Sequence, residues 1–134
     1  MALTMLVSCE KYDNYDASEL PIVGFTRANL NINNIPAGGE KASEVNVFSS
    51  TAANVDRTFN IVLIPNADPI GNPPADPENY EFDSTVTIPA NERIGVVNIL
   101  GKNISLPEDR TFFTLSVESG SDVIAGGVVT VGLK

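Results

Sequence analysis

The 134-residue sequence contains no histidine, no tryptophan and only one cysteine, Cys9. Without histidine, the chain can form neither a Ser-His-Asp triad nor a metal site built on imidazole ligands. A single cysteine cannot close an internal disulfide, so the fold must be stabilised by packing alone. These absences exclude several common kinds of catalytic and metal site.

Basic side chains are also scarce. The chain has 8 lysine and arginine residues against 17 aspartate and glutamate residues, for a formal net charge of −9. A surface of this sign repels the phosphates of nucleic acids, so no nucleic-acid partner is expected. It equally disfavours docking on anionic lipid through basic patches. The excess of acid is typical of a surface that keeps a protein soluble.

Long runs of helix-forming residues are missing, whereas valine, isoleucine, threonine and phenylalanine recur along the chain. This bias favours strands over helices. The length suits one domain, which at this size buries roughly two-thirds of the surface of its unfolded chain. The sequence therefore predicts a single all-β domain.

Near the N-terminus, a short apolar stretch ends at a cysteine. Leu6, Val7, Ser8 and Cys9 resemble the lipobox of bacterial lipoproteins. That resemblance implies that the Cys9 thiol receives a diacylglycerol and that the preceding peptide is removed. We therefore expect residues 1–8 to be a truncated remnant of a signal peptide. A short buried strand with a core cysteine is the alternative.

Residues 9–20 are polar and show no strand or helix period, so we expect a lipidated flexible tether. Its acidic residues resemble the surface-export signals of Bacteroidetes lipoproteins, which implies an outer-membrane or cell-surface location. The lipid on Cys9 would make the membrane a partner. Tyr12 and Tyr15 lie in this tether and cannot be held rigidly enough to bind a ligand.

Residues 21–134 alternate apolar and polar positions in short segments separated by turns. This pattern predicts about seven to eight strands in a two-sheet, immunoglobulin-like sandwich. Residues 65–77 contain five prolines and are expected to form a long loop without structure. The strand residues expected in the core are Phe59, Leu63, Ile88, Phe113, Leu115 and Val131.

Residues 80–100 and 111–117, with the turn at 37–40, resemble a Calx-β domain. The resemblance implies a sandwich of this type from a small Bacteroidetes surface lipoprotein. Calcium-binding members place carboxylates at defined turns, where this chain has Asn79, Gly101 and Lys102. Calcium takes six to eight oxygen ligands, several of them anionic. We therefore expect neither a tight calcium site nor any other metal or cofactor.

The remaining candidates for chemistry are few. Asp76, Glu78, Glu81 and Asp83 could form a weak cation site or the carboxylate pair of a glycoside hydrolase. A solvated acidic rim is favoured over both. Tyr80 and Phe82 alternate with two of these acids, and core packing is favoured for them over sugar stacking.

Two further motifs carry little weight. Ser49, Ser50 and Thr51 have no visible base, so the sequence does not support a nucleophile there. Residues 103–105 form a glycosylation-type sequon, which a bacterial context makes uninformative. No catalytic residue is expected, and the sequence does not identify ligand-binding residues.

The sequence thus predicts a non-enzymatic, lipid-anchored surface module for interaction or structure, with a protein or glycan as ligand. One alternative is a glycan-binding accessory lipoprotein of a polysaccharide-uptake system. A carboxylate-based glycoside hydrolase is the other.

Overall fold

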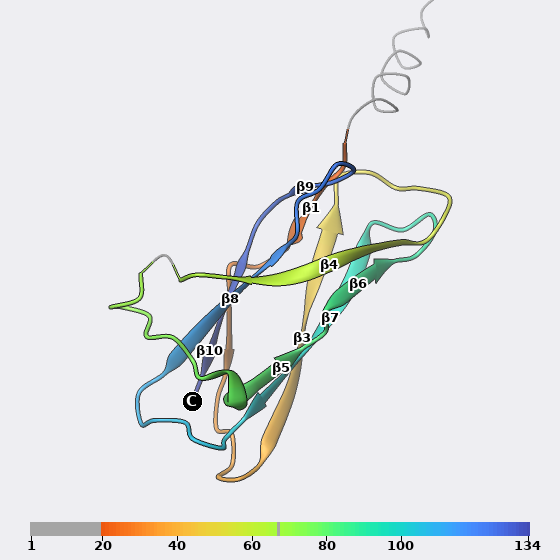
Figure 1. The fold of residues 1–134 in the computed structure, drawn as a ribbon. Helices are drawn as coiled ribbons and strands as arrows, with labels where there is room; N and C mark the ends of the chain where they lie inside the picture. The colour runs from red at the N-terminus through yellow and green to blue at the C-terminus, as the bar shows by residue number, and fades with distance from the viewer. Residues whose placement is uncertain (1–19, 67) are drawn as a thin grey trace, which may run out of the picture.

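The computed structural model describes residues 20–66 and 68–134 (Figure 1). Over these residues the chain forms ten strands in two five-stranded sheets. The prediction of an all-β, two-sheet sandwich is confirmed. In this part of the chain, no helix is long and apolar enough to cross a membrane. The predictions for residues 1–8 and for Cys9, Tyr12 and Tyr15 fall outside the described residues.

Sheet I contains five strands, of which two are very short. Its spatial order is β5 (Tyr80–Phe82), β7 (Ile94–Lys102), β3 (Glu40–Ser49), β1 (Ile22–Phe25) and β9 (Ile124–Ala125). All neighbours run antiparallel except β1 and β9, which are parallel. The long β3–β7 pair forms the centre of this sheet.

Sheet II has the C-terminal strand in its interior. Its order is β2 (Asn29–Ile32), β10 (Val129–Leu133), β8 (Thr111–Val117), β4 (Arg57–Ile64) and β6 (Thr85–Ile88). β2 and β10 are parallel, and the other neighbours are antiparallel. One turn of 3₁₀ helix, η1 (Pro77–Asn79), precedes β5.

The strand count exceeds the predicted seven to eight because two short strands were missed. β5 and β9 contain three and two residues, too few to show an alternating pattern. The expected first two strands are both present in shortened form. Between β1 and β2 the chain crosses from sheet I to sheet II, so both sheets begin with N-terminal residues.

The core fills the space between the sheets with alternate side chains of each strand. Phe59, Ile88, Phe113, Leu115 and Val131 are all buried, which confirms five of the six predicted core residues. The structure also settles the register of the strand that is apolar on both faces. In β7, Val97 and Ile99 face the core, whereas Ile94 and Val96 face solvent.

The prediction for Leu63 was wrong. It continues the inward alternation of Phe59 and Ile61 on β4, yet it is 47% exposed. Alternation fixes the side of the sheet on which a residue lies, but burial also needs an opposing layer. At Leu63 that layer gives way to a groove described below.

We expect Phe113→Ala to lower the free energy of unfolding by about 3–5 kcal/mol, because it removes a buried ring and leaves a cavity. Leu63→Ala, on the neighbouring strand, should cost about 1 kcal/mol or less because half of that side chain is already in water. Urea unfolding of the two variants and the wild type measures both values. Equal losses would contradict the assignment of Leu63 to the surface.

Candidate functional site

Residues 65–77 form a loop, as their prolines predicted, and the described part of it makes several internal hydrogen bonds. The backbone N–H of Asn72 donates to the carbonyl of Asp68 at 2.7 Å. The N–H of Gly71 donates to Oδ1 of the same aspartate at 3.0 Å. Asp68 therefore closes a tight turn of the kind that short carboxylate side chains stabilise.

The same segment is also joined to β8. The N–H of Phe112 donates to the carbonyl of Pro73, and the N–H of Ala75 donates to the carbonyl of Phe112, both at 2.8 Å. Pro74 thus forms an isolated parallel bridge with Phe112. The Thr114 hydroxyl donates to Oδ1 of Asn66 at 2.8 Å. The loop is held against sheet II at both ends.

Between this loop and the sandwich lies an apolar groove of about 520 Å³, which we call the loop groove. Three separate parts of the chain contribute to it: the end of β4 with the following loop, the start of β5, and β8. Its lining is Leu63, Ile64, Pro65, Asn66, Pro69, Pro74, Ala75, Tyr80, Phe112, Phe113 and Thr114. This volume falls within the range of small-ligand sites.

One side of the groove is supported by stacked aromatic rings. Tyr80 and Phe113 stack with ring centroids 3.9 Å apart and an angle of 9° between the planes. Phe82 lies nearly parallel at 6.3 Å from Tyr80. The prediction that Tyr80 packs in the core is confirmed, since Phe113 covers one face of its ring. Burial, with a smaller contribution from Asp76, raises the pKa of the Tyr80 phenol above 10.0.

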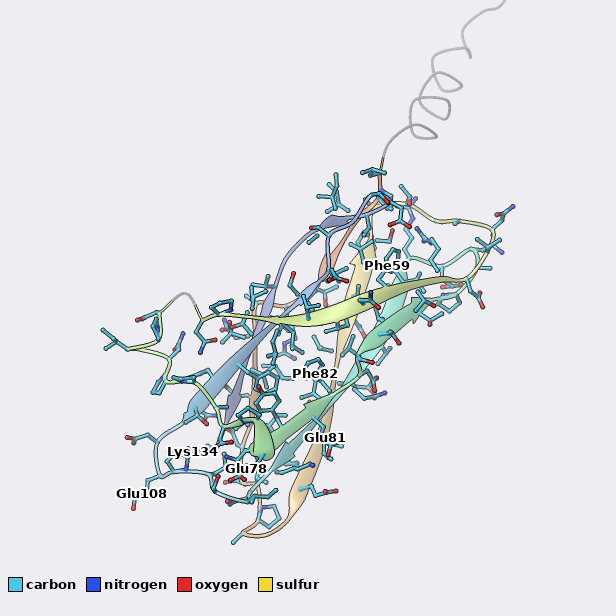
Figure 2. The ribbon with its side chains drawn as sticks, in the orientation of Figure 1. Phe59, Glu78, Glu81, Phe82, Glu108 and Lys134 are labelled. Carbon is cyan, nitrogen blue, oxygen red and sulfur yellow. The ribbon has the colours of Figure 1, made fainter. Side chains whose placement is uncertain are left out.

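The predicted acidic cluster is divided among separate local roles. Asp76 caps η1 by accepting from the N–H of Glu78 at 3.2 Å. Glu81 forms an ion pair with Lys102. Asp83 Oδ2 accepts from the backbone N–H and from the side-chain Nδ2 of Asn98, at 2.9 and 3.0 Å. Figure 2 shows Glu78 and Glu81 beside η1 and β5.

Of these acids, Glu81 and Asp83 border the same hollow of about 310 Å³, and neither Asp76 nor Glu78 lines it. Over the described ranges, no three acidic, histidine or cysteine side chains gather in a way that could hold a metal ion. Asp76, Glu78 and Glu81 are exposed, whereas Asp83 is half-buried.

The three positions that correspond to calcium ligands in Calx-β domains have other roles here. Asn79 is fully buried, and its Oδ1 accepts from the N–H groups of Ile104 and Ser105 at 3.1 and 2.9 Å. Gly101 faces the core, where a Cβ atom would lie 2.9 Å from Ile35. Lys102 pairs with Glu81.

The other motifs also have structural partners. Asn103, the first residue of the sequon, donates through Nδ2 to the carbonyl of Ile35 at 3.0 Å. Arg57, which the sequence did not single out, donates to the hydroxyls of Ser49 and Thr51 at 3.2 and 3.1 Å. Ser50 Oγ accepts from the N–H of Ile22 at 2.8 Å.

The loop groove itself was not predicted. The density of prolines in residues 65–77 was the available signal, because proline stiffens a loop and lowers the entropy lost on ordering it. Its contacts with β8 join residues about forty positions apart in the chain. No local pattern shows such contacts.

In sequence, the chain matches no family model and no curated protein. In fold, it is similar to solved structures from Bacteroides. One, from Bacteroides ovatus ATCC 8483, is described provisionally as carbohydrate-binding; it has a TM-score of 0.67 and 9% identity over 84% of this chain. Another is a Bacteroides ovatus multidomain protein that includes DUF1735, with a TM-score of 0.62 and 16% identity over 84% of this chain.

A two-domain protein of unknown function from Bacteroides fragilis matches 98% of this chain, with a TM-score of 0.60 and 13% identity. The chain spans only part of these structures, namely 36%, 45% and 51% of their respective lengths. At these identities the likeness shows a shared fold.

We expect the stability of the protein to fall above pH 10 partly because of Tyr80. Its raised pKa means that the folded state retains the phenol proton where the unfolded chain has lost it. The contribution is present below the ordinary pKa of 10.0 and is lost as the pH rises through the folded value. Urea unfolding at several alkaline pH values, compared with Tyr80→Phe, measures it. Identical pH dependence in both proteins would contradict the assignment.

We also expect no micromolar calcium binding, and at most the millimolar association known for extracellular modules. Asn79→Asp restores the acid of the family pattern but should not create a tight site. The Oδ1 atom of residue 79, which the substitution retains, already accepts from two N–H groups, and position 101 faces the core. Isothermal titration of both proteins with calcium tests this expectation. Micromolar affinity in either protein would show that other ligands complete a site.

Proposed function

We propose that this chain is a non-catalytic binding module, displayed on a bacterial cell surface or outer membrane and anchored by lipid on Cys9. The loop groove is the observation that supports a binding role. Its walls come from two sheets and a loop fixed by backbone hydrogen bonds, so its shape exists before a ligand arrives. Preformed apolar grooves of this size lose little entropy when a ligand binds.

We propose no catalysis because most of the candidate carboxylates and hydroxyls already have hydrogen-bond or ion-pair partners in the fold. Asp76, Glu81 and Asp83 each have a partner in the fold. Ser49 accepts from Arg57, and the sequence offers no histidine to activate a hydroxyl. A glycoside hydrolase built on Glu81 and Asp83 would have to break the Lys102 ion pair and the Asn98 hydrogen bonds.

Surface display is supported by the lipobox and by the arrangement of the domain. β1 begins at one end of the sandwich, and the loop that borders the groove lies toward the other end (Figure 1). An anchor that precedes β1 would attach the domain at a distance from the groove. The fold likeness to Bacteroides proteins agrees with this proposal, as does the resemblance to Calx-β domains.

A glycan is the second candidate for the ligand class. It is favoured by the likeness to the Bacteroides ovatus structure described provisionally as carbohydrate-binding. In the groove, Phe112 is a partly exposed ring, and apolar ring faces bind the C–H surfaces of sugars. A role beside a polysaccharide-uptake system would follow from such binding.

The anchor is tested by expressing the gene, with its natural upstream DNA, in a Bacteroides host. Mass spectrometry of the purified protein should find acylated Cys9 as the first residue. Cys9→Ser should release the protein from the membrane fraction. A mature chain that keeps residues 1–8 would refute the anchor and leave the groove unaffected.

The groove is tested by a photo-crosslinking amino acid placed at position 63 on living cells, with position 104 as control. Both side chains are exposed, but only Leu63 lines the groove. A discrete adduct from position 63 alone is expected for a protein ligand. A panel of purified polysaccharides tests the glycan class, where Leu63→Asn should weaken binding and Ile104→Asn should not. If position 63 gives no specific adduct and no polysaccharide binds, the proposal is wrong.

A further inference from the structure

The solvent-facing side of sheet I carries an apolar surface that the groove does not explain. Five side chains that are between 43% and 50% exposed lie on its strands: Ile22, Phe48, Ile94, Val96 and Ile124. We call this set the sheet I patch. Solvent-facing positions of an antiparallel sheet are normally polar, so a group of this kind indicates an interaction surface.

The register of the strands makes the patch continuous. Ile22 lies beside Ile124 on the parallel pair β1–β9. Gly24, Phe48 and Ile94 are aligned across β1, β3 and β7. Gly24 leaves room for the loop that follows β9, since a Cβ atom at position 24 would clash with the backbone nitrogen of Gly127. Ile22, Gly24 and Phe48 all line one hollow of about 480 Å³.

The outer side of sheet II does not share this character. The solvent-facing positions of its β4–β6 pair are Thr58, Asn60, Thr85 and Thr87. Thr58 and Thr87 join their hydroxyls at 3.0 Å across the two strands. The outer face of the β4–β6 pair is thus polar, whereas that of sheet I offers apolar side chains in a row.

The patch is also uncharged, although the chain carries a net charge of −9. β1, β7 and β9 contain no aspartate or glutamate. On β3, Glu44 pairs with Asn98, beyond the patch along both strands. Glu78, Glu81 and Glu108 lie toward the end of the sandwich opposite the start of β1 (Figure 2). These acids therefore lie away from the patch. The charged side chain that borders it is Arg93, whose Nη1 donates to the carbonyl of Ser50 at 3.0 Å.

The position of the patch indicates what covers it. Leu20 and Pro21 directly precede Ile22, and the carbonyl of Pro21 accepts from the N–H of Ile124 at 2.9 Å. The path toward Cys9 therefore leaves from the edge of the patch. The roughly eleven peptide units between Cys9 and Leu20 span at most about 36–40 Å when extended. A bilayer that holds Cys9 lies within that distance.

We propose that the sheet I patch rests on the interfacial region of the bilayer in which the lipid on Cys9 is inserted. This inference rests on the proposed anchor. Five half-exposed apolar side chains bind a membrane weakly on their own. A tether of this length gives the patch an effective concentration of about millimolar at the bilayer, so a weak affinity is enough to keep it docked. The net negative charge favours a neutral leaflet over an anionic one.

The test uses the single cysteine and the lack of tryptophan. The full chain is coupled through Cys9 to a maleimide lipid in phosphatidylcholine vesicles, which replaces biological acylation. Phe48→Trp then supplies the only tryptophan, in the middle of the patch. Its fluorescence should shift to the blue on coupling and be quenched by lipids brominated in their acyl chains. Phe112→Trp, on the outer face of sheet II, is the matched control and should show neither effect.

Adding Ile94→Ser to the Phe48→Trp chain should reduce both the shift and the quenching. Docking is refuted if the tryptophan at position 48 is not quenched on coupled vesicles or if the one at position 112 is quenched equally. It is also refuted if the position-48 tryptophan is already blue-shifted without vesicles while sedimentation shows a dimer, which would make the patch a contact between two copies. Because the coupling is chemical, a failure of docking is distinct from a failure of acylation in cells.

Discussion

Tyr80 and Phe113 come from opposite sheets, and their stacked rings join the two halves of the sandwich. β5 is only three residues long, so its place at the edge of sheet I depends on this contact and on its pairing with β7. The stack also fixes where the loop groove closes, because both rings line it. The same interaction thus stabilises the core and shapes the candidate binding surface.

Much of this architecture follows from local pattern, and its limits can be seen in single residues. Alternation placed Phe113 and Leu115 correctly, because both lie on β8, whose inner side is covered along its length. It failed for Leu63, because the opposing sheet does not extend far enough to cover that side chain. It also left the inward face of β7 undecided, since the outward residues Ile94 and Val96 are apolar too. The sequence has no means of distinguishing an inner apolar row from an outer one when both are present.

The candidate site depended still more on distant contacts. Asn79 occupies a position where the resemblance expected a calcium ligand, and its role was decided by the backbone of Ile104 and Ser105. The role of Arg57 follows only from the folded structure, in which its guanidinium donates to the hydroxyls of Ser49 and Thr51. In each case the residue type was informative about its chemistry but not about its partner.

The parallel pairing of β2 with β10 has a consequence for when the protein can fold. Leu30 is aligned with Val131, so one of the first strands to be synthesised must wait for one of the last. Contacts this distant in sequence slow folding and leave strand edges open in the meantime. During synthesis, sheet II cannot be completed until β10 has emerged. Late closure would suit the surface display proposed above, because an extended chain crosses a translocation pore more easily than a finished sandwich.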